Sequence, residues 1–170
     1  DTTQGTDTNR AKVYINGSQV TDFSVATYPS ENFDTDVNIV DAHYVGSLAA
    51  GNYHDGYLSD VNFIDGLALT PSSFGELKNG AWIPINTSGL TFGTNGFRLQ
   101  FAQVGVGTAS TSTIGADTSG NTNHFTSSGI VASDCDMPDS PENNFATLNP
   151  LNNQANSTLS EGNLKAVLAS

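Results

Sequence analysis

The fold class is decided by the stretch Lys12-Val13-Tyr14-Ile15-Asn16-Gly17-Ser18-Gln19-Val20. Residues whose side chains alternate between two faces precede Asn16-Gly17. This pair tolerates the positive φ angles of a type I′ turn. The stretch predicts a β-hairpin in which residues 12–15 pair with residues 19–23. We expect Val13 and Ile15 on the buried face, with Val20 and Phe23 returning to it.

The rest of the chain reads as further short strands separated by loops. Residues 28–41 are polar and broken by Pro29, which predicts a long loop. We expect strands over residues 43–48, 57–65, 81–85 and 97–101. Residues 70–75 predict one helical turn with Pro71 at its first position, and residues 161–168 predict a short helix.

The strand over residues 57–65 carries a packing prediction of its own. Strict alternation would place Val61 and Phe63 on one face and Leu58 on the other. A β-bulge at Ser59-Asp60 would reset the pleat and turn all three apolar side chains inward. We therefore expect all three to be buried.

Composition favours an all-β chain with a thin core. Hydrophobic residues make up 36% of the sequence and charged residues 13%, against the usual ~45–50% and ~25%. Thr, Ser, Asn and Gly supply the polar surface instead, and these residues suit short strands and tight turns.

Charge and cysteine content narrow the environment and the partners. Seventeen acidic against five basic residues give a net charge of −12. A negative field repels phosphate groups, so we expect neither nucleic acid nor anionic membrane as a partner. Cys135 is the only cysteine, so these residues hold no internal disulfide. No apolar run has the length of a membrane span, and no signal peptide is visible. We expect a fragment of a longer, extracellular-type polypeptide.

Residues 56–70, Gly-Tyr-Leu-Ser-Asp-Val-Asn-Phe-Ile-Asp-Gly-Leu-Ala-Leu-Thr, resemble the late strand and following turn of laminin-G-like (concanavalin A-like) jelly rolls. The upstream Val13-Tyr14-Ile15-Asn16-Gly17 hairpin is similar to another element of that family. The resemblance covers roughly residues 1–70 and implies an antiparallel jelly-roll sandwich. The family carries an acid pair where this chain has Ser59 and Asp60.

A second resemblance points to tailed-phage tail-fibre and related virion proteins. It is carried by residues 74–75, 82–84, 96–101, 117–125, 139–151 and 158–165. In such proteins this run follows a laminin-G-like module. The implied organisation is a jelly-roll part over residues 1–104 and a loop-rich, Gly/Ser/Asn-rich extension over residues 105–170.

The resemblance begins partway through the jelly roll, which predicts that its N-terminal strands precede Asp1. A sheet that lacks strands exposes backbone donors and acceptors along an edge, and such edges recruit partners. We expect upstream residues or strands of neighbouring virion subunits to complete the sheets, with a homo-oligomer as the assembly.

The loop over residues 117–123 is the candidate metal site. It places Asp117, Ser119, Asn121 and Asn123 at alternate positions around a glycine, and calcium prefers six to eight oxygen ligands. The same side chains also cap their own turns without a metal. The self-capped turn is the favoured interpretation, and calcium is the candidate cofactor.

The other polar clusters offer weaker chemistry. Asp134, Asp136 and Asp139 straddle a cysteine and a proline, so a solvated loop is favoured over the fixed carboxylate pair of a glycosidase. His43, His54 and His124 lie far apart, and neither a triad nor a zinc motif accompanies them. No catalytic residue is predicted.

Aromatic residues give the candidate ligand site. Tyr53, His54, Asp55 and Trp82 could bind a sugar, because aromatic faces pair with the apolar side of a pyranose. Core packing or a loop anchor is the favoured role of Trp82.

Three functions remain open from the sequence. The first is a non-catalytic structural or receptor-binding module of a phage tail fibre or virion appendage, which contacts host-surface glycan or neighbouring subunits. The second is a carbohydrate-binding module of a secreted enzyme or adhesin. The third, a glycoside hydrolase or lyase, is disfavoured because no acid pair is placed for it.

Overall fold

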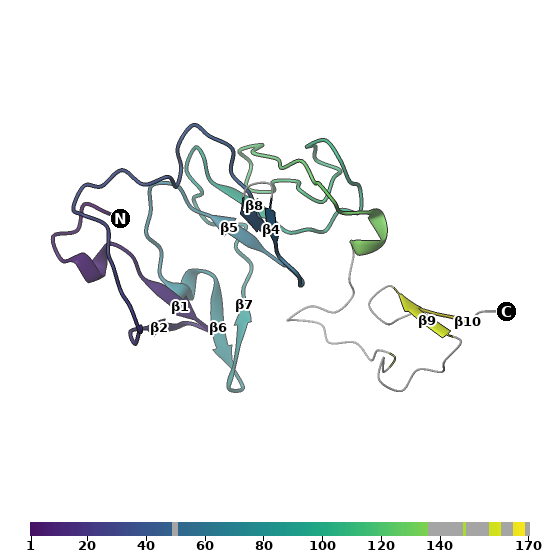
Figure 1. Ribbon diagram of the computed structural model, residues 1–170, viewed down its shortest axis with the longest axis horizontal. Helices are drawn as coiled ribbons and strands as arrows, with labels where there is room; N and C mark the ends of the chain where they lie inside the picture. Colours follow the sequence, from purple (N-terminus) through teal and green to yellow (C-terminus); the bar gives the residue numbers. More distant parts are fainter. Residues whose placement is uncertain (49–50, 136–147, 149–156, 161–164, 169–170) are drawn as a thin grey trace. The chain divides into compact units, whose positions relative to one another are not determined.

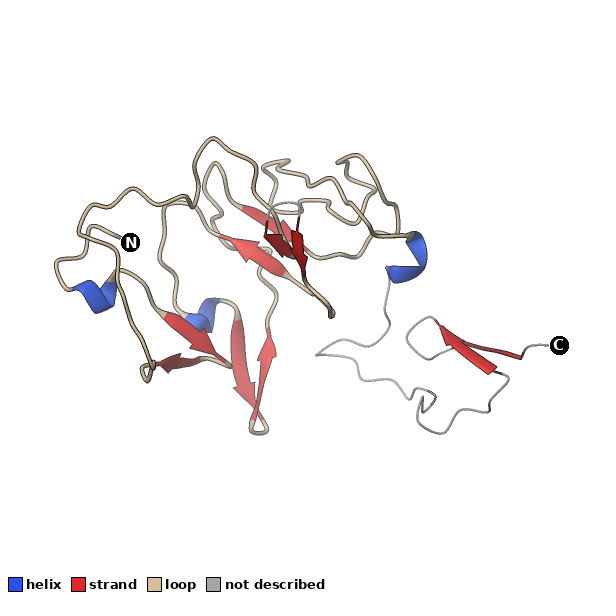
Figure 2. Ribbon diagram, in the orientation of Figure 1, coloured by secondary structure: helices blue, strands red, loops and turns tan. Residues whose placement is uncertain are grey.

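The computed structural model describes residues 1–48, 51–135, 148, 157–160 and 165–168. Ten short strands and three 3-10 turns are the regular elements of these residues, and none of them is an α-helix (Figures 1 and 2). The strands are β1 Val13–Ile15, β2 Ser18–Val20, β3 Ser47–Leu48, β4 Gly51–Tyr53, β5 Val61–Phe63, β6 Gly75–Lys78, β7 Ala81–Pro84, β8 Phe97–Leu99, β9 Ser157–Ser160 and β10 Lys165–Leu168. The 3-10 turns are η1 Asp7–Asn9, η2 Pro71–Ser73 and η3 Ala132–Asp134. The all-β class is confirmed.

All described strands pair antiparallel in two-stranded sheets. The chain divides into two compact units. The first unit, residues 1–58 and 64–95, holds the β1–β2, β3–β4 and β6–β7 pairs. The second unit, residues 59–63 and 96–170, holds the β5–β8 and β9–β10 pairs. No helix among the described residues is long and apolar enough to cross a membrane.

The β1–β2 hairpin forms with the predicted turn. Val13 pairs with Val20 and Ile15 with Ser18. Asn16 has φ 49° and Gly17 has φ 78°, the positive angles that a type I′ turn requires at both central positions. The hairpin and its turn are confirmed, but its second strand is Ser18–Val20 and does not extend to Phe23.

The predicted buried face of this hairpin is wrong. Val13 is 50% exposed, Ile15 62% and Phe23 41%, and Val20 is half-buried. Only a second layer can cover a hairpin face, and the pattern of alternation says nothing about whether that layer is present. In the described part of the chain this face is left open.

Gly17 provides a test of the turn. Gly17→Val should destabilise the first unit by roughly 1–2 kcal/mol, because a β-branched residue resists the left-handed region. A Cβ there would also collide with the ring of Trp82. Urea unfolding followed by the fluorescence of Trp82, the only tryptophan, measures the loss. Gly5→Val is the matched control, since open space surrounds Gly5; equal losses in the two variants would contradict the turn assignment.

Strand β5 pairs with β8 and organises the second unit. Val61 lies opposite Leu99 and Phe63 opposite Phe97. The rings of Phe63 and Phe97 stack with centroids 5.4 Å apart, and Phe125 meets Phe97 edge-on at 4.8 Å. These three rings join the strand pair to the loop that follows.

The predicted inward turn of Leu58 is wrong. Val61 and Phe63 are half-buried, but Leu58 is 43% exposed. Asp60 adopts φ 47°, and strand β5 begins only at Val61. Because the left-handed residue precedes the strand instead of interrupting it, no bulge resets the pleat to bring Leu58 inward.

The Gly- and Ser-rich residues after 104 contribute two buried hydrophobic residues. Ile114 is 7% exposed and Ala116 1%, and both lie in the same unit as the buried Leu99 of β8. The N–H of Ile114 donates to the carbonyl of Gly105 (2.7 Å), and the N–H of Phe125 donates to that of Gly115 (2.8 Å). Small residues allow these backbones to approach closely, so the loops pack without regular strands.

Local predictions elsewhere have mixed outcomes. Residues 28–41 form a loop, η2 has Pro71 in its first turn, and residues 81–84 are extended, as predicted. Strand β3 begins only at Ser47, after Gly46 with φ 81°, and β8 ends at Leu99, before Phe101 with φ 55°. Positive φ at these two residues limits both strands.

The predicted helix over residues 161–168 is wrong in its described part. Lys165–Leu168 is strand β10, which pairs along its length with β9, so that Lys165 lies opposite Ser160 and Leu168 opposite Ser157. Residues 161–164 lie outside the described residues. A short apolar stretch fits a helix or a strand equally well by periodicity, and pairing with a neighbouring segment decides between them.

Candidate functional site

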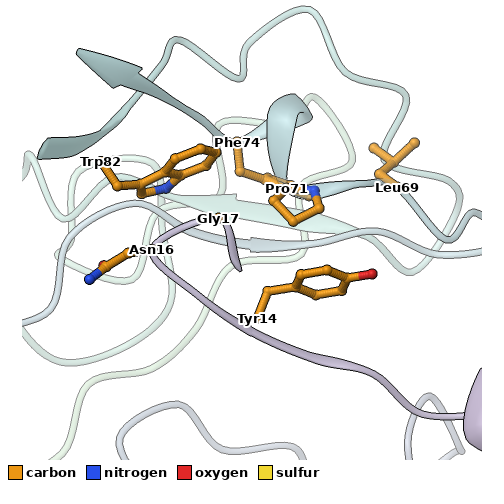
Figure 3. A pocket seen from close by; sticks show the side chains of 7 residues that line it. All are labelled: Tyr14, Asn16, Gly17, Leu69, Pro71, Phe74 and Trp82. Carbon is orange, nitrogen blue, oxygen red and sulfur yellow. The ribbon is translucent and has the colours of Figure 1, made fainter. Parts of the chain in front are cut away.

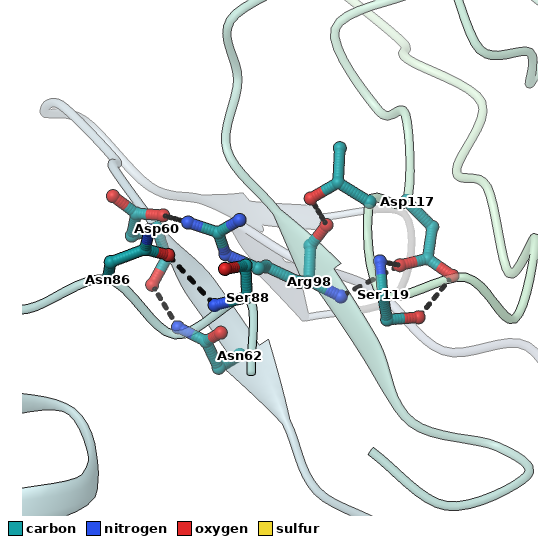
Figure 4. A network of polar contacts seen from close by, with 8 residues as sticks. Asp60, Asn62, Asn86, Ser88, Arg98, Asp117 and Ser119 are labelled. Atoms are coloured by element: carbon teal, nitrogen blue, oxygen red, sulfur yellow. Dashed lines mark hydrogen bonds and ion pairs between the residues drawn. The ribbon is translucent and has the colours of Figure 1, made fainter. Parts of the chain in front are cut away.

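The loop that follows β8 brings the four candidate metal ligands together, but their polar atoms are used within the protein. Asp117 is a buried residue with an exposed fraction of 7%. The backbone N–H groups of Arg98 (2.9 Å) and Ser119 (2.8 Å) donate to its Oδ1. The Ser119 hydroxyl and the Asn123 N–H donate to its Oδ2, both at 2.9 Å (Figure 4 draws the Ser119 contacts).

The two asparagines close the same loop from its other end. The side-chain amides of Asn121 and Asn123 each donate to the carbonyl of Gly96 at 2.9 Å. The N–H of Asn121 donates to the Ser119 hydroxyl (3.2 Å). The structure thus shows the self-capped turn. Among the described residues, no three His, Cys, Asp or Glu side chains gather where they could hold a metal ion.

The surroundings of Asp117 favour its ionised form. Burial by itself raises the pKa of this carboxyl group. The hydrogen bonds from Arg98, Ser119 and Asn123 act in the opposite direction and outweigh it, so the pKa lies below its ordinary value. The ionised carboxylate therefore stabilises the fold, because it accepts hydrogen bonds from four donors.

Arg98 is a buried cation that the sequence did not single out. It is 8% exposed, and its Nη2 lies 3.4 Å from Oδ1 of Asp60, just before β5 (Figure 4). The Asn62 side chain, opposite Arg98 in the ladder, donates to the Asp60 carbonyl (3.0 Å). The ion pair thus fixes the entry to β5 beside β8. A basic residue on an otherwise apolar strand is the only signal that could have indicated it.

The candidate sugar-binding residues are not brought into one site. Tyr53 is 73% exposed at the end of β4, and His54 and Asp55 are exposed in the segment that follows. The His54 N–H donates to the Gly46 carbonyl (2.7 Å), which joins this segment to the residue that precedes β3. Trp82 lies on β7 and lines a cleft of which none of these three forms a wall.

The cleft of Trp82 lies within the first unit and has a volume of about 320 Å³. Figure 3 shows its walls, which come from β1, the β1–β2 turn, η2 with its flanking residues, and β7. They are Tyr14, Asn16, Gly17, Leu69, Pro71, Phe74 and Trp82. A Cβ on Gly17 or Gly75 would collide with the indole, so these glycines admit the Trp82 ring and anchor it.

The aromatic and amide composition of this cleft is typical of a binding surface. Tyr14 is 39% exposed, and Phe74 and Trp82 are half-buried, so aromatic surface remains open to a ligand. Asn16 is exposed beside it. The sequence indicated Trp82 but not Tyr14, Asn16 or Phe74.

Asp134 of the acid cluster lies in η3, where its carboxylate accepts the N–H of Val131 (3.0 Å). Asp136 and Asp139 lie outside the described residues, as do residues 139–147, 149–151 and 161–164 of the second resemblance.

Comparison of the chain with protein-family models, with curated proteins and with solved structures finds no match.

Proposed function

We propose that the chain is a non-catalytic structural or receptor-binding module of a phage tail fibre or related virion appendage. In this proposal the short sheets are parts of a laminin-G-like jelly-roll sandwich that strands of neighbouring subunits complete. The virion setting rests on the sequence resemblances. The assembly role rests on the apolar surface of the described residues.

Exposed apolar side chains are the observation that carries the proposal. Among the described residues, 23 large apolar side chains are exposed, and the buried hydrophobic residues number four. Contiguous exposed apolar surface marks interaction sites in soluble proteins. Val13 and Ile15 share one face of the hairpin, where alternate residues of a strand point the same way.

Strand edges supply the second element of the proposal. Each strand of a two-stranded sheet has one edge outside its ladder, and isolated pairs of strands are marginally stable in water. Pairing with strands of a second copy would satisfy backbone groups and cover the apolar faces together. A homo-oligomeric virion appendage, exposed outside the host cell, provides such copies at high local concentration.

The use of polar groups supports a non-catalytic role. Asp117 accepts a hydrogen bond within its own loop, Asp60 forms an ion pair with Arg98, and Asp134 caps η3. These carboxylates serve as structural acceptors. The second candidate, a carbohydrate-binding module of a secreted enzyme or adhesin, is favoured by the aromatic cleft alone.

Ile15→Lys tests the assembly role. Ile15 is 62% exposed, so the change should leave the isolated chain folded, with an effect on its stability within about 0.5 kcal/mol. In an oligomer the new charge would be buried, so sedimentation velocity should show dissociation toward the monomer. Gln19→Lys adds the same charge to the other face of the hairpin and should leave the oligomer intact. Identical sedimentation of wild type and Ile15→Lys would count against this face as the interface.

A further inference from the structure

The cleft of Trp82 has a ligand chemistry of its own. Its three aromatic walls come from separate segments: Tyr14 from β1, Phe74 from the end of η2 and Trp82 from β7. At the edge of the cleft, Asn16 adds an exposed amide that can donate and accept hydrogen bonds. The Tyr14 hydroxyl makes a long contact of 3.4 Å with Oε1 of Gln19, so it adds a second polar group to the rim.

We propose that this cleft binds a neutral pyranose ring of a glycan. A pyranose has an apolar face, which packs on aromatic rings, and a rim of hydroxyl groups, which match an amide and a phenol. The volume of about 320 Å³ lies at the lower end of ligand pockets and suits one ring with its linkage. This inference deepens the proposed function, because it identifies the site and the class of glycan that a receptor-binding module would use.

Charge selects a neutral sugar over an acidic one. None of the residues that line the cleft carries a charge, while the chain as a whole has a net charge of −12. An acidic sugar would meet this field without a cation in the cleft to compensate it. The absence of a carboxylate from its walls also makes binding independent of calcium.

Two glycines fix the position of the Trp82 ring in the cleft. The Trp82 ring lies against Gly17 in the turn and Gly75 in β6, two positions where a side chain would collide with it. Gly17 also has φ 78°, which commits the turn to its observed shape. A rigid aromatic wall reduces the entropy that binding would otherwise cost.

Trp82 makes the proposal directly measurable, because it is the only tryptophan of the chain. Its emission should change saturably when methyl glycosides of glucose, galactose, mannose or N-acetylglucosamine are titrated, with at least one dissociation constant in the millimolar range or tighter. Glucuronic acid and N-acetylneuraminic acid should bind more weakly, and a calcium chelator should have no effect. Tighter binding of the acidic sugars would overturn the assignment.

Variants of Tyr14 test whether glycosides bind in the cleft. Tyr14→Ala should weaken glycoside binding roughly tenfold, the equivalent of ~1.4 kcal/mol, and Tyr14→Phe should retain most of the affinity. Tyr57→Ala removes a tyrosine that is 80% exposed and outside the cleft, and binding should remain unchanged. If none of the glycosides alters Trp82 emission, or if a proline-rich peptide does so in their place, the proposal is wrong.

Failure of the sugar-binding proposal can be distinguished from failure of the proposed function. A chain that assembles through its Val13 and Ile15 face but binds no glycoside would refute only the sugar site. A chain that binds glycosides as a stable monomer would retain the sugar site and refute assembly.

Discussion

Replacing Asp117 with alanine should destabilise the second unit by about 3–5 kcal/mol. Asp117 is a buried residue, and its carboxylate accepts four hydrogen bonds from Arg98, Ser119 and Asn123. The substitution leaves the buried N–H of Arg98 without its acceptor, and each buried donor left in this way costs ~1–3 kcal/mol. Bonds to an ionised acceptor lie at the strong end of that range. Urea unfolding followed by circular dichroism measures the loss.

Acid titration provides an independent check of the same group. Because the pKa of Asp117 is lower in the folded protein, its contribution to stability is complete above the unfolded-state pKa of ~3.9 and is lost as pH falls through the folded-state value. The difference in free energy of unfolding between wild type and Asp117→Asn should therefore become smaller as the pH is lowered below about 4. Exposed Asp22→Asn is the matched control. If the difference in free energy of unfolding between wild type and Asp117→Asn does not change with pH, the charge of Asp117 has no structural role.

Leu99→Ala should cost about 2–5 kcal/mol, the range for a leucine truncated inside a packed core. Leu99 is 1% exposed and is the largest fully buried side chain among the described residues. It pairs with Val61 across the β5–β8 ladder and forms an isolated bridge with Asp117. The cavity would therefore lie where the strand pair meets the loop.

Leu77→Ala is the matched control for this prediction, since Leu77 is 70% exposed on β6. Its free energy of unfolding should stay within about 0.5 kcal/mol of wild type. Comparable losses for the two leucines in urea unfolding would mean that the core of the second unit is not centred on Leu99.

Features set by neighbouring residues could be predicted from the sequence. Asn16-Gly17 specifies its turn because few residue pairs accept two consecutive positive φ angles. Pro71 marks the first turn of η2 because its own φ is already helical. Both depend on backbone sterics within a few residues, and both are confirmed.

Burial could not be predicted in the same way. Alternation places Val13 and Ile15 on one face, but whether another layer covers that face depends on segments distant in the sequence. Leu58 illustrates the same limit, because one positive φ angle at Asp60 decided where β5 begins. The residues after 104 lack alternation, yet Ile114 is buried through loop contacts that have no periodic signature.

The candidate sites show a similar division. The alternate oxygen-bearing residues 117–123 lie in one local loop, in which Asp117 accepts hydrogen bonds from Ser119 and Asn123. The cleft joins Tyr14, Phe74 and Trp82 from distant segments, so no local pattern connects them.

Hydrogen exchange at increasing protein concentration, with sedimentation velocity on the same samples, tests the central claim most directly. If other copies complete these sheets, strand amides outside the two-stranded ladders should exchange fast in dilute solution. They should become protected as the sedimenting species grows. A monomer at all concentrations, with uniformly protected strands and a cooperative melting transition, would contradict the account.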